Sequence, residues 1–145
     1  MKDPSKLDQQ LCFEVYKASS NFSKLYARTL EPFHLTFSQY LVLLTLWDQN
    51  NLLVKDIGNR LGLGIGTLNP IVNRMIENGW LNKKQSSKDK RAFVISLTEK
   101  AIKQEKPIEQ AIISKITNCN YLDINADTLM TNLKELNAFL NQLKE

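Results

Sequence analysis

Two short amphipathic segments joined by a glycine-rich turn constrain the fold of this chain more than any other feature. Val54, Ile57 and Leu61 fit one face of a short helix, which Gly62 can end. After the turn "GLGIG" comes a second helix, which Gly79 can end. Its inward face consists of Leu68, Ile71, Val72, Met75 and Ile76. Two short helices connected in this way are typical of a helix-turn-helix.

The second helix has a polar outer face. Its members are Thr67, Asn69, Pro70, Asn73 and Arg74. These side chains are short or can hydrogen-bond to base edges and phosphates, the groups that a recognition helix meets in the major groove. Plain helical bundles also contain amphipathic helices and glycine turns, so the pattern alone is not specific to DNA-binding proteins.

The whole net charge of the chain, +4, lies in one stretch directly after this pattern. "WLNKKQ" and "AFVISL" predict two strands, with "SSKDKR" at the tip between them. In the rest of the chain 14 basic residues balance 14 acidic ones, whereas residues 81–91 set one acid against Lys83, Lys84, Lys88, Lys90 and Arg91. A helix-turn-helix followed by a basic hairpin predicts a winged helix that binds double-stranded DNA. A merely solvated lysine-rich turn would leave the polar outer face unexplained.

Within this hairpin we expect two kinds of DNA contact. Arg91, at the far end of the tip, is the candidate for insertion into the minor groove or for clamping a phosphate. The four lysines are expected to contribute nonspecific, salt-sensitive affinity. Asp89 can hold the tip in shape through Arg91.

A long helix is predicted before this core. Asp3 is a suitable N-cap and Pro4 a suitable first residue, and the helix continues to about Leu30. It should end there because Pro32 disfavours helical geometry at Glu31.

Two more helices flank the winged-helix pattern. Thr36 and Gln39 make a capping box before an apolar helix over about 37–49. Another helix should start near Glu99, and Pro107 is expected to kink or interrupt it.

The last helix carries leucines at spacings of four and three, typical of the seam of a coiled-coil-like contact. They are Leu129, Leu133, Leu136, Leu140 and Leu143. We therefore expect one domain over 1–145, mainly α with a small β-hairpin, with a winged-helix core at about 36–98. Residues 4–32 and 99–145 would supply dimerisation helices of a homodimer. The alternative is that the seam packs inside its own chain.

The composition excludes several other classes. The start of the chain is too polar for a signal peptide, and no apolar run suits a membrane span, so a cytoplasmic protein is expected. The two cysteines are far apart and form no zinc motif, and neither a metal nor a cofactor is expected. Motifs of hydrolases, nucleotide-binding enzymes and dehydrogenases are absent, so an enzyme is not predicted.

Cys12 is the one residue with an open choice between packing and chemistry. A lone thiol on an apolar helical face is more often a small hydrophobic residue, and well inside its helix it would gain little from the helix dipole. Tyr16, one turn later, could donate a hydrogen bond to it. Tyr26 lies 14 residues further on, about 21 Å along the axis, and could approach Cys12 only from a second chain.

"QLCFEVY", "LTFSQYLVLLTLWD", "GTLNPIVNRM" and "DKRAFVISLTEKA" resemble the MarR family of winged-helix regulators over nearly the whole chain, in particular its organic hydroperoxide resistance branch. The resemblance implies that Cys12 senses peroxide, with Tyr16 and with Tyr26 of the other subunit as hydrogen-bond donors. It also implies that Cys119 acts as the resolving cysteine. One departure is that Gly64 and Ile65 replace a polar pair, so the recognition helix lacks a serine N-cap.

The resemblance thus implies a dimeric repressor that leaves its operator when Cys12 is oxidised, with an intersubunit disulfide to Cys119 as a further step. Two alternatives remain open. One is a regulator gated by a small phenolic or apolar acid, with passive cysteines. The other is a thiol peroxidase, which would turn over peroxide in the presence of a reductant.

Overall fold

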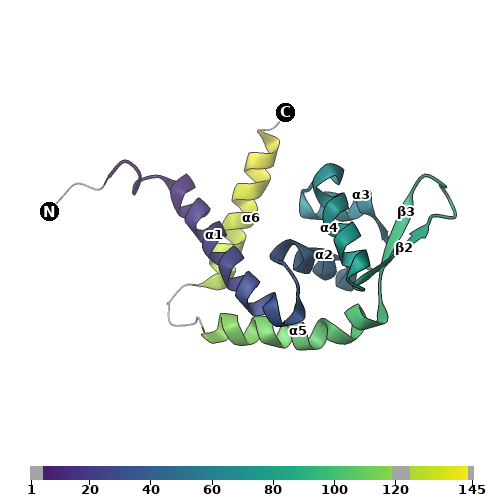
Figure 1. Cartoon of the computed structure of the whole chain (residues 1–145). Coiled ribbons are helices and arrows are strands. Elements are labelled where there is room, and N and C mark those ends of the chain that lie inside the picture. The colour runs from purple at the N-terminus through teal and green to yellow at the C-terminus, as the bar shows by residue number, and fades with distance from the viewer. Residues whose placement is uncertain (1–4, 119–124, 144–145) are drawn as a thin grey trace. The chain divides into compact units, whose positions relative to one another are not determined.

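The computed structural model describes residues 5–118 and 125–143 (Figure 1). The elements in chain order are α1 (Leu11–Leu30), the 3-10 helix η1 (Glu31–Phe33), α2 (Phe37–Asp48), β1 (Leu52–Leu53), α3 (Val54–Leu61), α4 (Ile65–Glu77), β2 (Leu81–Gln85), β3 (Phe93–Leu97), α5 (Glu99–Asn118) and α6 (Ala126–Gln142). The predicted fold class, mainly α with a small β-hairpin, is confirmed. The chain divides into two compact units, residues 1–113 and 114–145. None of the helices in the described ranges is long and apolar enough to span a membrane.

Helix α1 begins later than the sequence predicts. Its first residue is Leu11 rather than Pro4, and residues 6–9 form a turn. Asp3 and Pro4 lie outside the described residues. The side chain of Ser5 accepts a hydrogen bond from the N–H of Asp8 at 3.1 Å. Gln10, in extended geometry at φ −91° and ψ 119°, separates this turn from α1.

The end of α1 is at Leu30, as predicted, but the reason given for it is wrong. Glu31 keeps right-handed helical geometry, with φ −54° and ψ −45°. Pro32 lies in the first turn of η1, where its missing N–H removes no helical hydrogen bond. The reversal instead falls on His34, whose backbone is left-handed at φ 57° and whose N–H donates to the carbonyl of Glu31 at 2.9 Å.

Helix α2 forms the centre of the core, and its prediction is confirmed. Both arms of the capping box are present: the N–H of Gln39 donates to Thr36 Oγ1 at 3.2 Å, and the N–H of Thr36 donates to Gln39 Oε1 at 3.1 Å. Three of its side chains are fully buried, namely Val42, Leu43 and Leu46. Residues from α3, α4 and β3 join the same cluster, so α2 is the support on which the helix-turn-helix rests.

The sheet has three antiparallel strands in the order β1-β3-β2. Strand β1 was not predicted, because two residues are too few to show a period. It pairs with β3 through Leu52 opposite Ile95. The sequence predicts a kink or an interruption of α5 at Pro107, and the interruption is wrong, since the helix runs unbroken from Glu99 to Asn118. A proline in a helix removes one hydrogen bond, and a helix of 20 residues retains the rest.

Candidate nucleic-acid interface and thiol site

The turn between α3 and α4 requires glycine at two positions. Gly62 ends α3 in the left-handed region, at φ 71°, as the sequence predicts. Gly58 was not recognised: its carbonyl accepts the N–H of Leu63 at 2.9 Å, and a Cβ on it would lie 2.6 Å from the carbonyl oxygen of Leu63. This close approach fixes how α4 leaves α3. A glycine inside a short amphipathic helix is the sequence signal that could have revealed it.

Helix α4 is anchored by one face and leaves the other free. Leu68, Val72 and Met75 are buried in the core. The five residues predicted to face DNA are all exposed: Thr67, Asn69, Pro70, Asn73 and Arg74. The N-cap is Gly64, without a side-chain hydrogen bond, in agreement with the missing serine.

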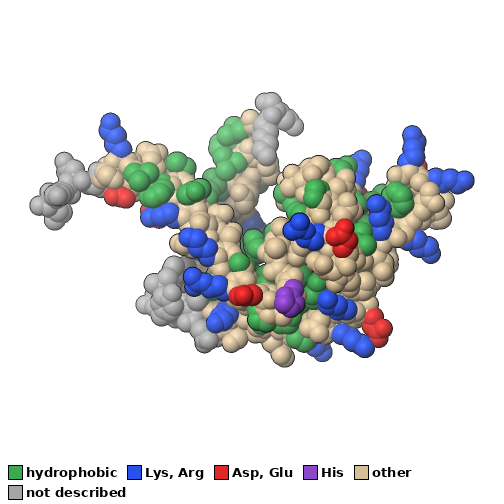
Figure 2. All heavy atoms as spheres, viewed as in Figure 1, with side chains coloured by type: hydrophobic (Ala, Val, Ile, Leu, Met, Phe, Trp, Pro, Cys, Tyr) green, Lys and Arg blue, Asp and Glu red, His purple; other side chains and the backbone are tan. Residues whose placement is uncertain are grey.

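The basic hairpin is formed by β2 and β3, which pair from Leu81 opposite Leu97 to Gln85 opposite Phe93. Its basic side chains are all exposed: Lys83, Lys84, Lys88, Lys90 and Arg91. Figure 2 shows lysine and arginine side chains projecting around this hairpin. Lys83 Nζ lies 4.3 Å from the centre of the Phe93 ring, a cation–π contact that holds one of these charges in place.

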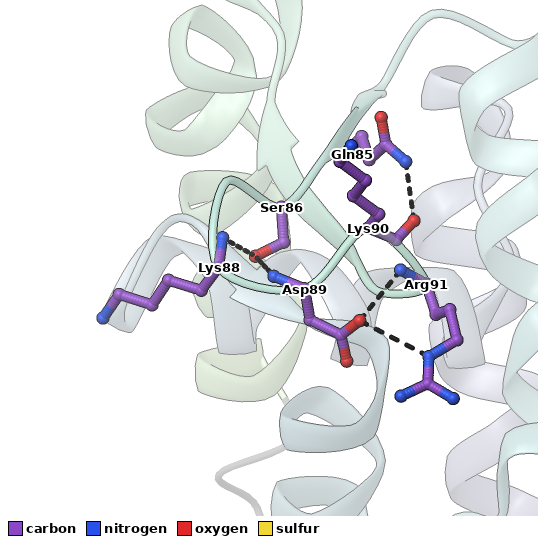
Figure 3. Close-up of polar contacts among 6 residues, drawn as sticks. All are labelled: Gln85, Ser86, Lys88, Asp89, Lys90 and Arg91. Atoms are coloured by element: carbon purple, nitrogen blue, oxygen red, sulfur yellow. Dashed lines mark hydrogen bonds and ion pairs between the residues drawn. The ribbon is translucent and has the colours of Figure 1, made fainter.

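The tip of the hairpin is ordered by its own side chains (Figure 3). Ser86 Oγ accepts the N–H groups of Lys88 at 3.2 Å and Asp89 at 3.4 Å. Asp89 Oδ1 in turn accepts the N–H of Arg91 at 3.0 Å and lies 3.7 Å from its Nε. The side chain of Arg91 nevertheless remains 95% exposed. The tip therefore has a defined shape while its arginine stays accessible.

Cys12 is exposed and lies in the first turn of α1. The expectation that it sits well inside the helix is wrong, because α1 begins at Leu11. The first turn of a helix carries N–H groups without helical partners, and a negative charge is favoured there. Tyr16 is 70% exposed, and within the described part of the chain no hydrogen bond joins its hydroxyl to Cys12.

Tyr26 belongs to an aromatic cluster at the other end of α1. Its ring centre is 4.7 Å from that of Phe37 and 5.8 Å from that of Tyr40. Burial raises the pKa of Tyr26, so its hydroxyl keeps its proton at neutral pH and can donate a hydrogen bond. The pKa of Tyr40 is raised by burial and then by Tyr26 and Glu109. One chain alone does not bring Tyr26 to Cys12, and Cys119 lies outside the described residues.

Among residues 5–118 and 125–143, no three His, Cys, Asp or Glu side chains gather as a metal ion would need.

Comparisons with known proteins agree with this arrangement. The family model described as "Transcriptional regulator SarA/Rot" matches residues 24–108. The organic hydroperoxide resistance transcriptional regulator of Bacillus subtilis (strain 168) is 42% identical over 108 residues, which cover 74% of each chain.

Two solved structures of AbfR, a protein of Staphylococcus epidermidis, are 35% identical to this chain. Reduced AbfR bound to DNA aligns over 97% of this chain and 96% of that one with a TM-score of 0.84. AbfR with its disulfide formed aligns over 97% and 93% with a TM-score of 0.73. The prediction of a winged helix resembling the MarR family is thus confirmed. The chain belongs to the SarA/Rot family of transcriptional regulators, which are DNA-binding proteins with a MarR-like winged-helix fold.

Proposed function

We propose that this chain is a homodimeric repressor that binds a pseudo-palindromic operator while Cys12 is reduced and leaves it when Cys12 is oxidised by a peroxide. It would act in the cytoplasm, on double-stranded DNA. Residues 36–98 would form the DNA-binding core, and residues 4–32 and 99–145 would dimerise. The observation that carries the proposal is the exposure of Cys12 in the first turn of α1, in a chain whose polar helix face and basic hairpin suit DNA.

DNA binding would use two surfaces. The exposed polar face of α4 would enter the major groove, where Asn69, Asn73 and Arg74 can reach base edges or phosphates. The hairpin would lie along the backbone, with Arg91 at the minor groove. Its five positive charges would release counterions from the phosphates, which makes the affinity dependent on salt.

Dimerisation is supported by exposed apolar residues on a helix of each compact unit. On α6, Leu129, Leu133 and Leu140 are 38–46% exposed, and Leu143, directly after its end, is 64% exposed. On α1, Leu11, Val15 and Phe22 are exposed as well. Apolar stripes of this length are rarely left in water, so a second copy of the chain is their proposed partner. Two-fold symmetry would then present two copies of α4 to two half-sites.

The redox step has a defined chemistry. The thiolate of Cys12 attacks the O–O bond of the peroxide, which leaves a sulfenic acid on Cys12 and releases the alcohol or water. The thiol of Cys119 of the partner subunit then attacks that sulfur, forming a disulfide and releasing water. The two states of the relative AbfR, reduced on DNA and with a disulfide formed, support this sequence of events.

Release from DNA would follow from the geometry of the disulfide. A disulfide requires the two Cα atoms to come within about 7 Å. Closing it would draw the region of Cys119 toward α1 of the partner and turn the attached winged helices. The two copies of α4 would then no longer match successive major grooves, which lie about 34 Å apart.

The proposal is tested by substituting Cys12. The reduced wild type and Cys12→Ser are both expected to bind an operator duplex, whereas peroxide should weaken the wild type by at least about tenfold and leave Cys12→Ser unchanged. Fluorescence anisotropy of labelled duplex before and after peroxide measures this. Cys119→Ser is the control for disulfide formation, since its crosslinked dimer should be absent on nonreducing electrophoresis after peroxide. Release of Cys12→Ser by peroxide would refute the proposal.

A second prediction concerns the basic hairpin. Arg91→Ala is expected to lower operator affinity and to reduce the slope of log K against log salt by about 0.9, because one phosphate contact is lost. Lys103→Ala is the matched control: Lys103 is an exposed cation on α5, 3.0 Å from Glu99, and should leave the slope unchanged. Titrations at several salt concentrations give both slopes. Equal slopes for the wild type and Arg91→Ala would argue against a phosphate contact.

A further inference from the structure

Ile65, the first residue of α4, is apolar but not part of the core. It is 51% exposed, whereas Leu68, Val72 and Met75 on the same helix are buried. Ile65 has the largest exposed fraction of the large apolar side chains of α4. Burial in the monomer therefore does not account for an isoleucine at this position.

The surroundings of Ile65 are open. Gly64 precedes it and Gly66 follows it, and a Cβ added to either would find nothing within 4 Å. Side chains of a helix point toward its N-terminus, so Ile65 extends beyond the start of α4. At 100° per residue it lies about 40° from Asn69 and about 80° from Asn73 around the axis. It therefore borders the polar face that the proposed function directs into DNA.

The chemistry of the major groove offers one partner for such a side chain. An isoleucine can neither donate nor accept a hydrogen bond, so it reads no polar base edge. The C5-methyl group of thymine is the apolar group that the major groove presents, and contact with apolar side chains distinguishes it from cytosine. Residues at the N-terminal end of a recognition helix are the ones that reach the bases.

We propose that Ile65 determines sequence specificity by contacting the C5-methyl group of a thymine in each half-site of the operator. The inference rests on the proposed function, because it requires α4 to enter the major groove. It assigns the recognition of thymine to Ile65 and predicts that apolar contact alone provides this recognition.

The test removes only the methyl group. A duplex is selected by the wild-type protein from a random-sequence pool, and its thymines are replaced one position at a time by deoxyuridine. Binding is measured by fluorescence anisotropy at one salt concentration with reduced protein. At one position of each half-site, the wild type is expected to lose about fourfold in affinity, the effect of one buried methyl group.

Two variants assign that loss to a side chain. Ile65→Ala should bind the thymine and deoxyuridine duplexes equally well at that position. Leu44→Ala is the matched control, since Leu44 is an exposed apolar residue of α2 outside the DNA-facing surfaces and should keep the fourfold difference.

The outcomes separate the two proposals. If deoxyuridine has no effect on the wild type at any position, or if Ile65→Ala retains the same loss, the thymine contact is refuted while DNA binding stands. If the reduced wild type enriches no duplex from the pool, the proposed function fails, and the thymine contact fails with it.

Discussion

A chain carrying both Leu133→Asp and Leu140→Asp is expected to be monomeric and to lose about 100-fold to 10,000-fold in operator affinity. Both leucines lie on the exposed apolar seam of α6, and a carboxylate buried there without a partner would oppose association. A dimer binds its second half-site intramolecularly, an advantage that a monomer does not have. Analytical ultracentrifugation measures the mass, and anisotropy measures the affinity.

The control for this variant places the same charge on the opposite side of α6. Ala138 is exposed and lies about 140° around the axis from Leu133, so Ala138→Asp should remain dimeric and keep its affinity. If the chain with both substitutions still sediments as a dimer, the leucines do not form the dimer contact.

The second large effect is expected at the turn of the helix-turn-helix. Gly58→Ala would place a Cβ 2.6 Å from the carbonyl oxygen of Leu63. A backbone carbonyl cannot rotate away as a flexible side chain can, so the turn must open. This opening strains the hydrogen bond from the N–H of Leu63 to the carbonyl of residue 58. We expect the free energy of unfolding to fall by about 1–3 kcal/mol, as for other overpacked sites, and operator affinity to fall with it. Urea titration followed by circular dichroism measures the stability.

Gly66→Ala is the matched control for stability. Gly66 is also helical, but an added Cβ there meets nothing within 4 Å. Alanine favours the helix over glycine by up to about 1 kcal/mol, so this variant should be as stable as the wild type or more so. If Gly58→Ala and Gly66→Ala unfold at the same urea concentration, close packing at Gly58 is not what fixes the turn.

The elements near the helix-turn-helix could be predicted because their signals are local and agree with one another. Thr36 and Gln39 specify the start of α2 through a reciprocal pair of hydrogen bonds. Gly62 marks the end of α3 because left-handed backbone suits glycine. Regular apolar spacing and a single block of charge were sufficient for α4 and the hairpin.

The differences arise at features that a local apolar pattern does not encode. The start of α1 is later than predicted because Gln10 takes extended geometry after a turn at residues 6–9, which a helix pattern does not reveal. Strand β1 exists only because β3 pairs with it, so its two residues carry no signal of their own. The role of Gly58 depends on its distance to the carbonyl oxygen of Leu63, which the sequence alone does not give.

The candidate site was predicted in two different ways. The DNA-facing residues of α4 and the hairpin were predicted from charge and periodicity, and all of them are exposed in the structure. The chemistry of Cys12 came from resemblance, since the residues alone favoured packing. Its exposure in the first turn of α1 is the observation on which the proposed redox role rests. The approach of Tyr26 and Cys119 to Cys12 involves a second chain and stays a prediction.

The ordered tip of the hairpin bears on the thermodynamics of association. Ser86 and Asp89 already fix the backbone from Lys88 to Arg91 in the free chain. The conformational freedom of this backbone is therefore lost during folding, so the backbone of the tip adds little entropic cost when DNA binds. With the backbone preorganised in this way, the entropic cost of association at the tip falls mainly on its exposed lysine and arginine side chains.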